Sequence, residues 1–156
     1  MRIFLAYPFT QLLNQETGLI DEKNTNLLLG MIDQIKEMGH TVFSAQFREH
    51  FGAKLMEAAP ATYEDFKEME GTDLVVAFPG QFPISGGVHV ELGWGSALGK
   101  QFIIFLHKDE SYSPMVEGLH TLTNVKYVRF GSETQEELTQ KVVDEISVHN
   151  KILEKL

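Results

Sequence analysis

The segment from Ser85 to Glu91 combines two features that could do chemistry together. Ser85-Gly86-Gly87 precedes an expected helix, and the glycines permit unusual backbone angles and close backbone approach. A helix start also offers unpaired N–H groups and a positive dipole end, which suits a phosphate or carboxylate ligand. Plain capping of the helix by Ser85 explains the pattern equally well. Glu91 follows about one turn into the same helix, where its carboxylate could act on whatever the anion site anchors.

Glu91 does not lie on an obviously polar helix face. Its neighbours at helical spacing are Val88, Trp94 and Gly95, whereas a lone glutamate on a helix is usually solvated. A catalytic carboxylate and a surface residue are therefore both open interpretations.

His89 and Glu91 also form the H-x-E pattern of zinc nucleobase deaminases. That signature needs a P-C-x-x-C partner, and the chain contains no cysteine, so we reject a deaminase. His89 then either touches a ligand or is a neutral structural histidine. Gly93-Trp94-Gly95 with Gly99 imitates a dinucleotide fingerprint, but these glycines fall inside the helix, where small residues permit close packing.

Three further positions have a structural and a functional interpretation. Asp65 lies on an expected helix and would by itself be assigned to the surface. Arg48-Glu49 follows the second expected strand, where ion pairing is slightly favoured over contact with the far end of a ligand. Phe4, within the first strand, is by default a core residue.

Apolar runs that alternate with helical patterns predict an α/β fold. Strands are expected at residues 3–7, 41–45, 73–78, 102–106 and 125–130. Helices are expected at 24–38, 60–70, 87–98 and 133–156. The pattern indicates one domain over 1–156, a flavodoxin-like or Rossmann-like three-layer sandwich with a five-stranded, mostly parallel sheet. Ligands of such sheets bind at the carboxyl ends of the strands, so function is expected in the loops at 7–9, 78–87 and 107–118.

The bulk composition excludes several classes of partner and site. The net charge of −9 argues against nucleic acid and anionic membranes as partners, and no apolar run is long enough for a membrane span. The absence of cysteine excludes disulfides, thiolate metal sites and a cysteine nucleophile. The amino terminus is too short for a signal peptide before the first strand, so we expect a cytoplasmic protein.

Together, several segments carry a family resemblance over roughly residues 2 to 130. They are Ile3-Phe4-Leu5-Ala6-Tyr7-Pro8-Phe9, Asp65 with Asp73-Leu74-Val75-Val76-Ala77, Ser85 through Trp94, and Ala97-Leu98-Gly99-Lys100. This order resembles the nucleoside 2-deoxyribosyltransferase superfamily. It is closer to the branch that hydrolyses nucleoside 5′-monophosphates, and most similar to the CMP and hydroxymethyl-CMP N-glycosidases. Shared stretches with these are Pro8-Phe9, Arg48-Glu49, Val76 to Gly80, His89-Val90-Glu91 and Gly118-Leu119.

The resemblance implies roles for the residues of the two chemical segments. Glu91 matches the catalytic glutamate, and Asp65 the aspartate near the base. Ser85 matches the phosphate-binding serine, with the backbone amides of Gly86, Gly87 and Val88 beside it. Ser113 matches a serine that contacts phosphate from the neighbouring subunit, although a simple helix N-cap followed by Pro114 is the alternative.

The resemblance also implies a base- and sugar-binding set and its preferences. That set is Phe4, Tyr7, Phe9, Arg48 and Phe78. Phe4 replaces a tyrosine of the deoxyribosyltransferases, which favours ribonucleotides. Thr10 replaces an arginine, which leaves the base open.

The expected activity is hydrolysis of CMP or hydroxymethyl-CMP to free pyrimidine base and ribose 5-phosphate, with no cofactor and no metal. A 2′-deoxynucleotide hydrolase or deoxyribosyltransferase is the alternative within enzymes. A nucleotide-binding sensor is the alternative outside them, and polar residues converging on one sheet end argue against a structural protein. The family resemblance implies a homodimer or higher homo-oligomer.

Overall fold

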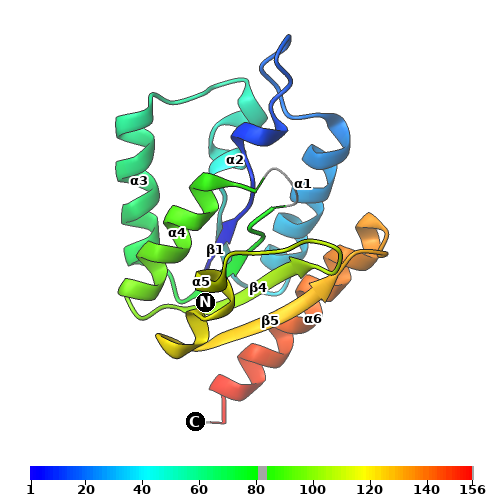
Figure 1. Cartoon of the computed structure of the whole chain (residues 1–156). Helices are drawn as coiled ribbons and strands as arrows, with labels where there is room; N and C mark the ends of the chain where they lie inside the picture. The colour runs from blue at the N-terminus through cyan, green and yellow to red at the C-terminus, as the bar shows by residue number, and fades with distance from the viewer. Residues whose placement is uncertain (81–83, 156) are drawn as a thin grey trace.

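The computed structural model describes residues 1–80 and 84–155 and forms a doubly wound α/β sandwich (Figure 1). Its sheet contains β1 (Arg2–Ala6), β2 (Thr41–Phe43), β3 (Leu74–Ala77), β4 (Gln101–His107) and β5 (Val125–Phe130). Its α-helices are α1 (Glu22–Glu37), α2 (Ala45–Arg48), α3 (Ala58–Glu70), α4 (Gly86–Ala97), α5 (Pro114–Glu117) and α6 (Gln135–Leu153). All neighbouring strands are parallel in the order β2-β1-β3-β4-β5, which confirms the predicted fold class.

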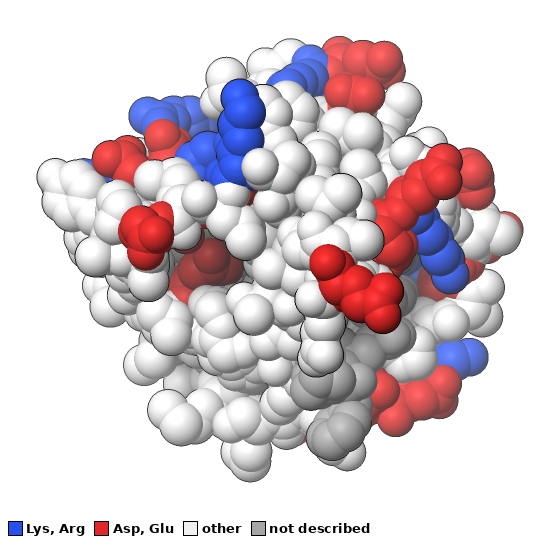
Figure 2. All heavy atoms as spheres, turned by 90° about the horizontal axis from the view of Figure 1, so that it is seen from above, with Lys and Arg blue, Asp and Glu red and all other residues white. Residues whose placement is uncertain are grey.

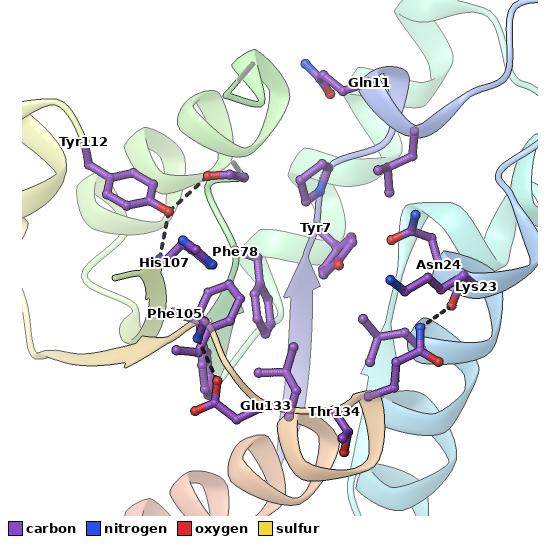
Figure 3. A pocket seen from close by; sticks show the side chains of 18 residues that line it. Tyr7, Gln11, Lys23, Asn24, Phe78, Phe105, His107, Tyr112, Glu133 and Thr134 are labelled. Carbon is purple, nitrogen blue, oxygen red and sulfur yellow. Dashed lines mark hydrogen bonds between the residues drawn. The ribbon is translucent and has the colours of Figure 1, made fainter. Parts of the chain in front are cut away.

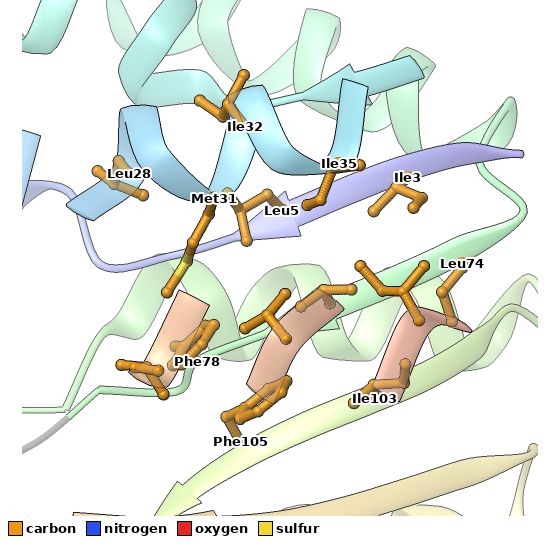
Figure 4. Close-up of a cluster of buried hydrophobic side chains, with 14 of the residues drawn as sticks. Ile3, Leu5, Leu28, Met31, Ile32, Ile35, Leu74, Phe78, Ile103 and Phe105 are labelled. Atoms are coloured by element: carbon orange, nitrogen blue, oxygen red, sulfur yellow. The ribbon is translucent and has the colours of Figure 1, made fainter. Parts of the chain in front are cut away.

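Helices cover both faces of the sheet. α1 packs beside α6 on one face, and α3 packs beside α4 on the other (Figure 1). Asp21 caps α1 by accepting a hydrogen bond from the backbone of Asn24, and the helix then presents an apolar stripe to the sheet. That stripe, the sheet and α6 enclose one buried cluster, in which Met31 and Ile35 are fully buried (Figure 4). Burial on both faces explains why the central strands are continuous apolar runs.

The sheet has its topological switch point between β1 and β3. From β1 the chain moves outward to β2, and after β3 it moves in the opposite direction to β4 and β5. The loops after β1 and β3 therefore separate and leave a crevice at the carboxyl edge of the sheet, where ligands of such folds bind. The expected loop at 78–87 includes residues 81–83, which lie outside the described residues.

Most predicted boundaries differ from the structure by one or two residues, and capping residues explain two of these differences. The strand expected at 41–45 stops at Phe43, since Ser44 accepts a hydrogen bond from Phe47 N and starts α2. The carboxy-terminal helix starts at Gln135 and not at 133, since Thr134 and Glu137 form a reciprocal capping box. Within the described residues, no helix is both long and apolar enough to cross a membrane.

Candidate active site

A cavity of about 320 Å³ opens at the switch point, on the side of the sheet covered by α3 and α4. Its wall comes from the end of β1 and the following loop, from α2 and the segment after it, and from α3 and α4. The lining residues are Leu5, Tyr7, Phe9, Thr10, Leu13, Ala45, Gln46, Glu49, Leu55, Met56, Asp65, Ser85, Gly87, Val88 and Glu91. The structure thus brings Glu91, Asp65 and Ser85 together, as expected from the sequence. Viewed from above, the molecule has a recess with acidic atoms at its floor (Figure 2).

Glu91 lines this cavity from α4. Its Oε2 atom is buried and has no hydrogen-bond partner among the described residues. Burial raises the pKa of Glu91 to about 8, and the nearby charge of Asp65 adds to the rise while Arg48 opposes it. An unpartnered buried carboxyl group is costly to keep, which is typical of groups that act on a ligand.

Asp65 faces the cavity from α3 and is held by an ion pair. Arg48 Nη1 lies 2.6 Å from Asp65 Oδ1, and Arg48 Nη2 lies 2.6 Å from Glu49 Oε1. The pairing expected for Arg48 and Glu49 is present, and it extends to Asp65, which is only 17% exposed at its side chain. Burial raises the pKa of Asp65, against the opposing effect of Arg48.

Ser85 starts α4 and lies almost fully buried at the cavity wall. Its Oγ accepts a hydrogen bond from Val88 N at 3.3 Å, so the capping interpretation is confirmed as geometry. Gly86 and Gly87 take ordinary helical angles, so the unusual backbone angles considered for them are not used. A Cβ atom on Gly86 would meet open space, which leaves the helix start accessible to a ligand.

The glycine that the local backbone does need is Gly80. It adopts φ 101°, and an added Cβ would lie 3.2 Å from Ser85 N and 3.3 Å from Pro8 Cγ. Gly80 therefore lets the loops after β1 and β3 approach each other beside the cavity.

The aromatic residues expected to bind base or sugar divide between different environments. Tyr7 and Phe9 line the cavity, and burial raises the pKa of Tyr7 to about 12. Phe4 is 1% exposed, packs 4.9 Å from Phe43 between ring centroids, and is absent from the cavity wall. Phe78 stacks on Phe105 at 4.7 Å and lines a different cavity. For Phe4 and Phe78 the structure offers a packing role.

Four other expected site residues also lie outside the wall, and Gly86 at the start of α4 is one of them. Arg48 stands behind it, as its ion pairs require. His89 Nδ1 lies 2.7 Å from Ser85 O, and its buried Nε2 has no partner among the described residues. Ser113 caps α5 by accepting from Met115 N at 3.2 Å, with Pro114 in the first turn.

Two further polar residues line the cavity: Glu49, which the sequence named only as an ion-pair partner of Arg48, and Gln46, which it did not single out. Glu49 is 6% exposed and accepts from Met56 N, and Gln46 donates to Tyr7 O at 2.6 Å. Both lie at α2, which the sequence interpretation had merged partly into a strand. Ser44 as an N-cap before Ala45 was the available signal.

A larger cavity of about 440 Å³ lies on the α1 and α6 side of the same sheet edge (Figure 3). Phe78, Phe105 and Tyr7 form much of its wall, and Tyr7 is shared with the first cavity. Its carboxylate, Glu133, is already bound by Lys141 and by Gly131 N. We therefore assign the chemistry to the smaller cavity, where a carboxyl oxygen is free. The described residues contain no group of three or more potential metal ligands.

Comparison with known proteins identifies the family. A family model described as nucleoside 2-deoxyribosyltransferase matches residues 19–145. The chain belongs to this family. Its relatives are enzymes that act on the N-glycosidic bond of nucleosides and nucleotides. The resemblance inferred from the sequence motifs is confirmed, and no curated protein matches.

Solved structures place the chain near nucleotide glycosidases. A Clostridium botulinum CMP N-glycosidase, BcmB, is 31% identical with a TM-score of 0.68, covering 91% of this chain and 97% of that one. The solution structure of BlsM is 33% identical with a TM-score of 0.71, covering 93% of each chain. A 2-deoxyribosyltransferase from Bacillus psychrosaccharolyticus shares the fold at 20% identity and a TM-score of 0.58, covering 89% and 90%.

Proposed function

We propose that this protein hydrolyses the N-glycosidic bond of a nucleoside 5′-monophosphate, CMP or hydroxymethyl-CMP, to the free base and ribose 5-phosphate. The observation that carries the proposal is the Glu91 oxygen that has no partner within residues 1–80 and 84–155, in a cavity that also contains Asp65 and Ser85. The likeness to a CMP N-glycosidase over nearly the whole chain supports the choice of nucleotide.

The proposed first step breaks the bond between C1′ and the base nitrogen. This passes through an oxocarbenium-like state, which the Glu91 carboxylate stabilises or captures as a covalent ester, as in retaining glycosidases. Asp65 gives a proton to the departing base, which is otherwise a poor leaving group. Water then adds hydroxide to C1′, releases Glu91, and returns a proton to Asp65.

This step requires one proton on the pair of carboxyl groups. In the free protein that proton resides on Glu91, whose pKa is about 8, whereas the reactive form has it on Asp65. The two forms contain the same number of protons and interconvert by one transfer, so the pair titrates as a unit.

Ser85 and the amides at the start of α4 are proposed to hold the 5′-phosphate. The cap leaves the amides of Gly86 and Gly87 at a helix start, where backbone N–H groups and the helix dipole favour an anion. Because the phosphate is remote from the broken bond, its binding energy positions C1′ against Glu91.

Two alternative activities within the family would use the same arrangement of residues. A 2′-deoxynucleotide hydrolase would use the same groups, and a deoxyribosyltransferase would replace water by a second base as acceptor. Phe4, which the family resemblance linked to ribonucleotides, is buried outside the cavity wall, so the choice of ribonucleotide rests on the likeness to a CMP N-glycosidase. A nucleotide sensor would bind its ligand without cleaving it. Such a protein has no need for the Glu91 carboxyl group inside the cavity, which argues against a sensor.

The test is incubation with ribo- and deoxynucleoside monophosphates, with chromatographic identification of released base and sugar phosphate. CMP or hydroxymethyl-CMP should release base, and an added free base should not be incorporated into a new nucleotide. Glu91→Gln should lower turnover at least about a hundredfold while the fold survives. Glu136→Gln, an exposed change on α6, is the control. A folded Glu91→Gln variant with near-normal turnover, or wild type that binds but releases nothing, would refute the proposal.

A further inference from the structure

One guanidinium group serves three carboxyl groups around the candidate active site. Glu49, Asp65 and Glu91 line the cavity, while Arg48 stands behind its wall. The two terminal nitrogens of Arg48 each lie 2.6 Å from one carboxylate, that of Asp65 and that of Glu49. Glu91 is the member of the three whose buried oxygen has no described partner.

Several contacts surround Arg48. Glu49, which fixes one side of the guanidinium, is 6% exposed and accepts from Met56 N at 3.3 Å. The ring of Phe43 lies 5.4 Å from the Arg48 guanidinium carbon. Because both partners of Arg48 come from fixed elements, its fork determines where the Asp65 carboxylate points.

Around Glu91, carboxyl groups outnumber positively charged groups, and Arg48 is the cation that two of them contact. No lysine, arginine or histidine lines the cavity among the residues described. The titratable and charged groups around it are Asp65 and Glu64 on α3, Arg48 at the end of α2 with Glu49 directly after it, Tyr7 after β1, and His89 on its own helix. Three ionised carboxylates against one guanidinium would leave excess negative charge where a phosphate is proposed to bind, so a proton must be held there.

We propose that Arg48 is a positioning residue, which aims the Asp65 carboxylate toward Glu91 and supplies the positive charge beside it. The proton of the site therefore resides on Glu91 until a substrate is bound. The role in turnover rests on the proposed function, whereas the electrostatic arrangement can be measured without any substrate. This positioning role differs from the direct contact with base or sugar that the family resemblance implied for Arg48.

The first experiment follows the Glu91 carboxyl carbon by ¹³C NMR as a function of pH, with Glu91→Gln used to assign the signal. Arg48→Gln should move the Glu91 midpoint to higher pH by about 1 pH unit, because a nearby positive charge is lost. Asp65→Asn should move it to lower pH, because a nearby negative charge is lost. Lys67→Gln removes an equal charge from an exposed ion pair on α3 and should change nothing.

The second experiment measures turnover of the nucleotide that the wild type cleaves. In the wild type, kcat/KM should fall above about pH 8, as the carboxyl pair loses its last proton. Arg48→Gln should move this fall to higher pH and lower kcat about ten- to a hundredfold with little change in KM. Arg48→Lys keeps the charge but not the fork, so the fall should stay near pH 8 while kcat remains low.

The outcomes separate this inference from the proposed function. An unmoved Glu91 midpoint in folded Arg48→Gln overturns the inference, whether or not the wild type is active. A raised KM with unchanged kcat also overturns it, since Arg48 would then contact the ligand. If Arg48→Gln does not fold, Asp65→Asn still decides, because an unmoved or raised midpoint contradicts the charge balance. Wild type without turnover, but with the predicted midpoint shifts, overturns the proposed function alone.

Discussion

At the scale of single residues, Glu91 shows how a site departs from what stability favours. A carboxyl group with pKa about 8 in the folded chain, against an ordinary value of 4.5, binds a proton more tightly folded than unfolded. Between these two pH values the folded state therefore holds more protons than the unfolded state, and its stability falls as pH rises. Glu91 therefore lowers the free energy of unfolding at neutral and alkaline pH.

Glu91→Gln should accordingly stabilise the protein in a pH-dependent way. Below pH 4.5 both states of the wild-type carboxyl group are protonated, so the variant should gain nothing from this effect. Above pH 8 the gain reaches its limit, about 5 kcal/mol from the full shift and closer to 1–3 kcal/mol because Glu91 as a whole residue keeps some contact with solvent. Urea unfolding at pH 4, 7 and 9 measures this. A variant less stable than wild type at pH 9 would contradict the burial of an unpaired carboxyl group, and Glu136→Gln should show no such trend.

At the scale of elements, the sequence predicts what local pattern determines. The apolar run of β3 and the stripe of α1 predict buried elements because burial on the sheet needs those residues. The short helix α2 is missed, since four residues carry no periodic signal and only Ser44 marks its start. Ser85 and Glu91 are found because one helix carries both, so their spacing is local.

The contacts that the sequence could not predict join residues distant along the chain. Arg48 and Asp65 are separated by 17 positions and meet because α2 and α3 converge at the cavity. Phe78 follows β3 and was expected near the ligand, but its ring turns to Phe105 and the other cavity. The direction of a side chain at a strand end depends on the tertiary packing around it, which periodicity does not encode.

The start of α4 carries a capping role and a proposed ligand role, and Ser85→Ala separates them. Losing the cap should cost about 1 kcal/mol of stability. Losing a phosphate contact should also lower kcat/KM for the nucleotide about tenfold or more, whereas turnover of cytidine, which we expect to be much slower in the wild type, should not change.

Thr134→Ala is the matched control, because it removes the cap of α6 at a comparable cost in stability. Thermal unfolding and steady-state kinetics of both variants give the comparison. If Thr134→Ala and Ser85→Ala lower nucleotide turnover equally, or if cytidine and CMP are cleaved equally by wild type, the phosphate role of Ser85 is wrong.

At the scale of the whole molecule, the region around Ser113 suggests a contact between copies of the chain. Met115 on α5 is 82% exposed and Leu122 shortly after it is 71% exposed. A second copy of the chain seated over α5 would remove such side chains from water. Ser113 itself is absent from the wall of its own chain's cavity, in keeping with the proposal that it completes the site of a neighbouring subunit.

Mixing two inactive variants tests this shared site. Glu91→Gln and Ser113→Ala should each lose most turnover, and each should remain dimeric by light scattering. In a mixed dimer, the Ser113→Ala subunit supplies Glu91 and the Glu91→Gln subunit supplies Ser113, so one of the two sites is intact. Subunits exchanged in equal amounts should thus recover roughly a quarter of wild-type activity, because half of the dimers are mixed and each has one working site. Recovery of activity requires that residues from two chains meet in one site. Three results would show instead that every chain forms its site alone: a monomeric protein, a fully active Ser113→Ala variant, or a mixture no more active than its components.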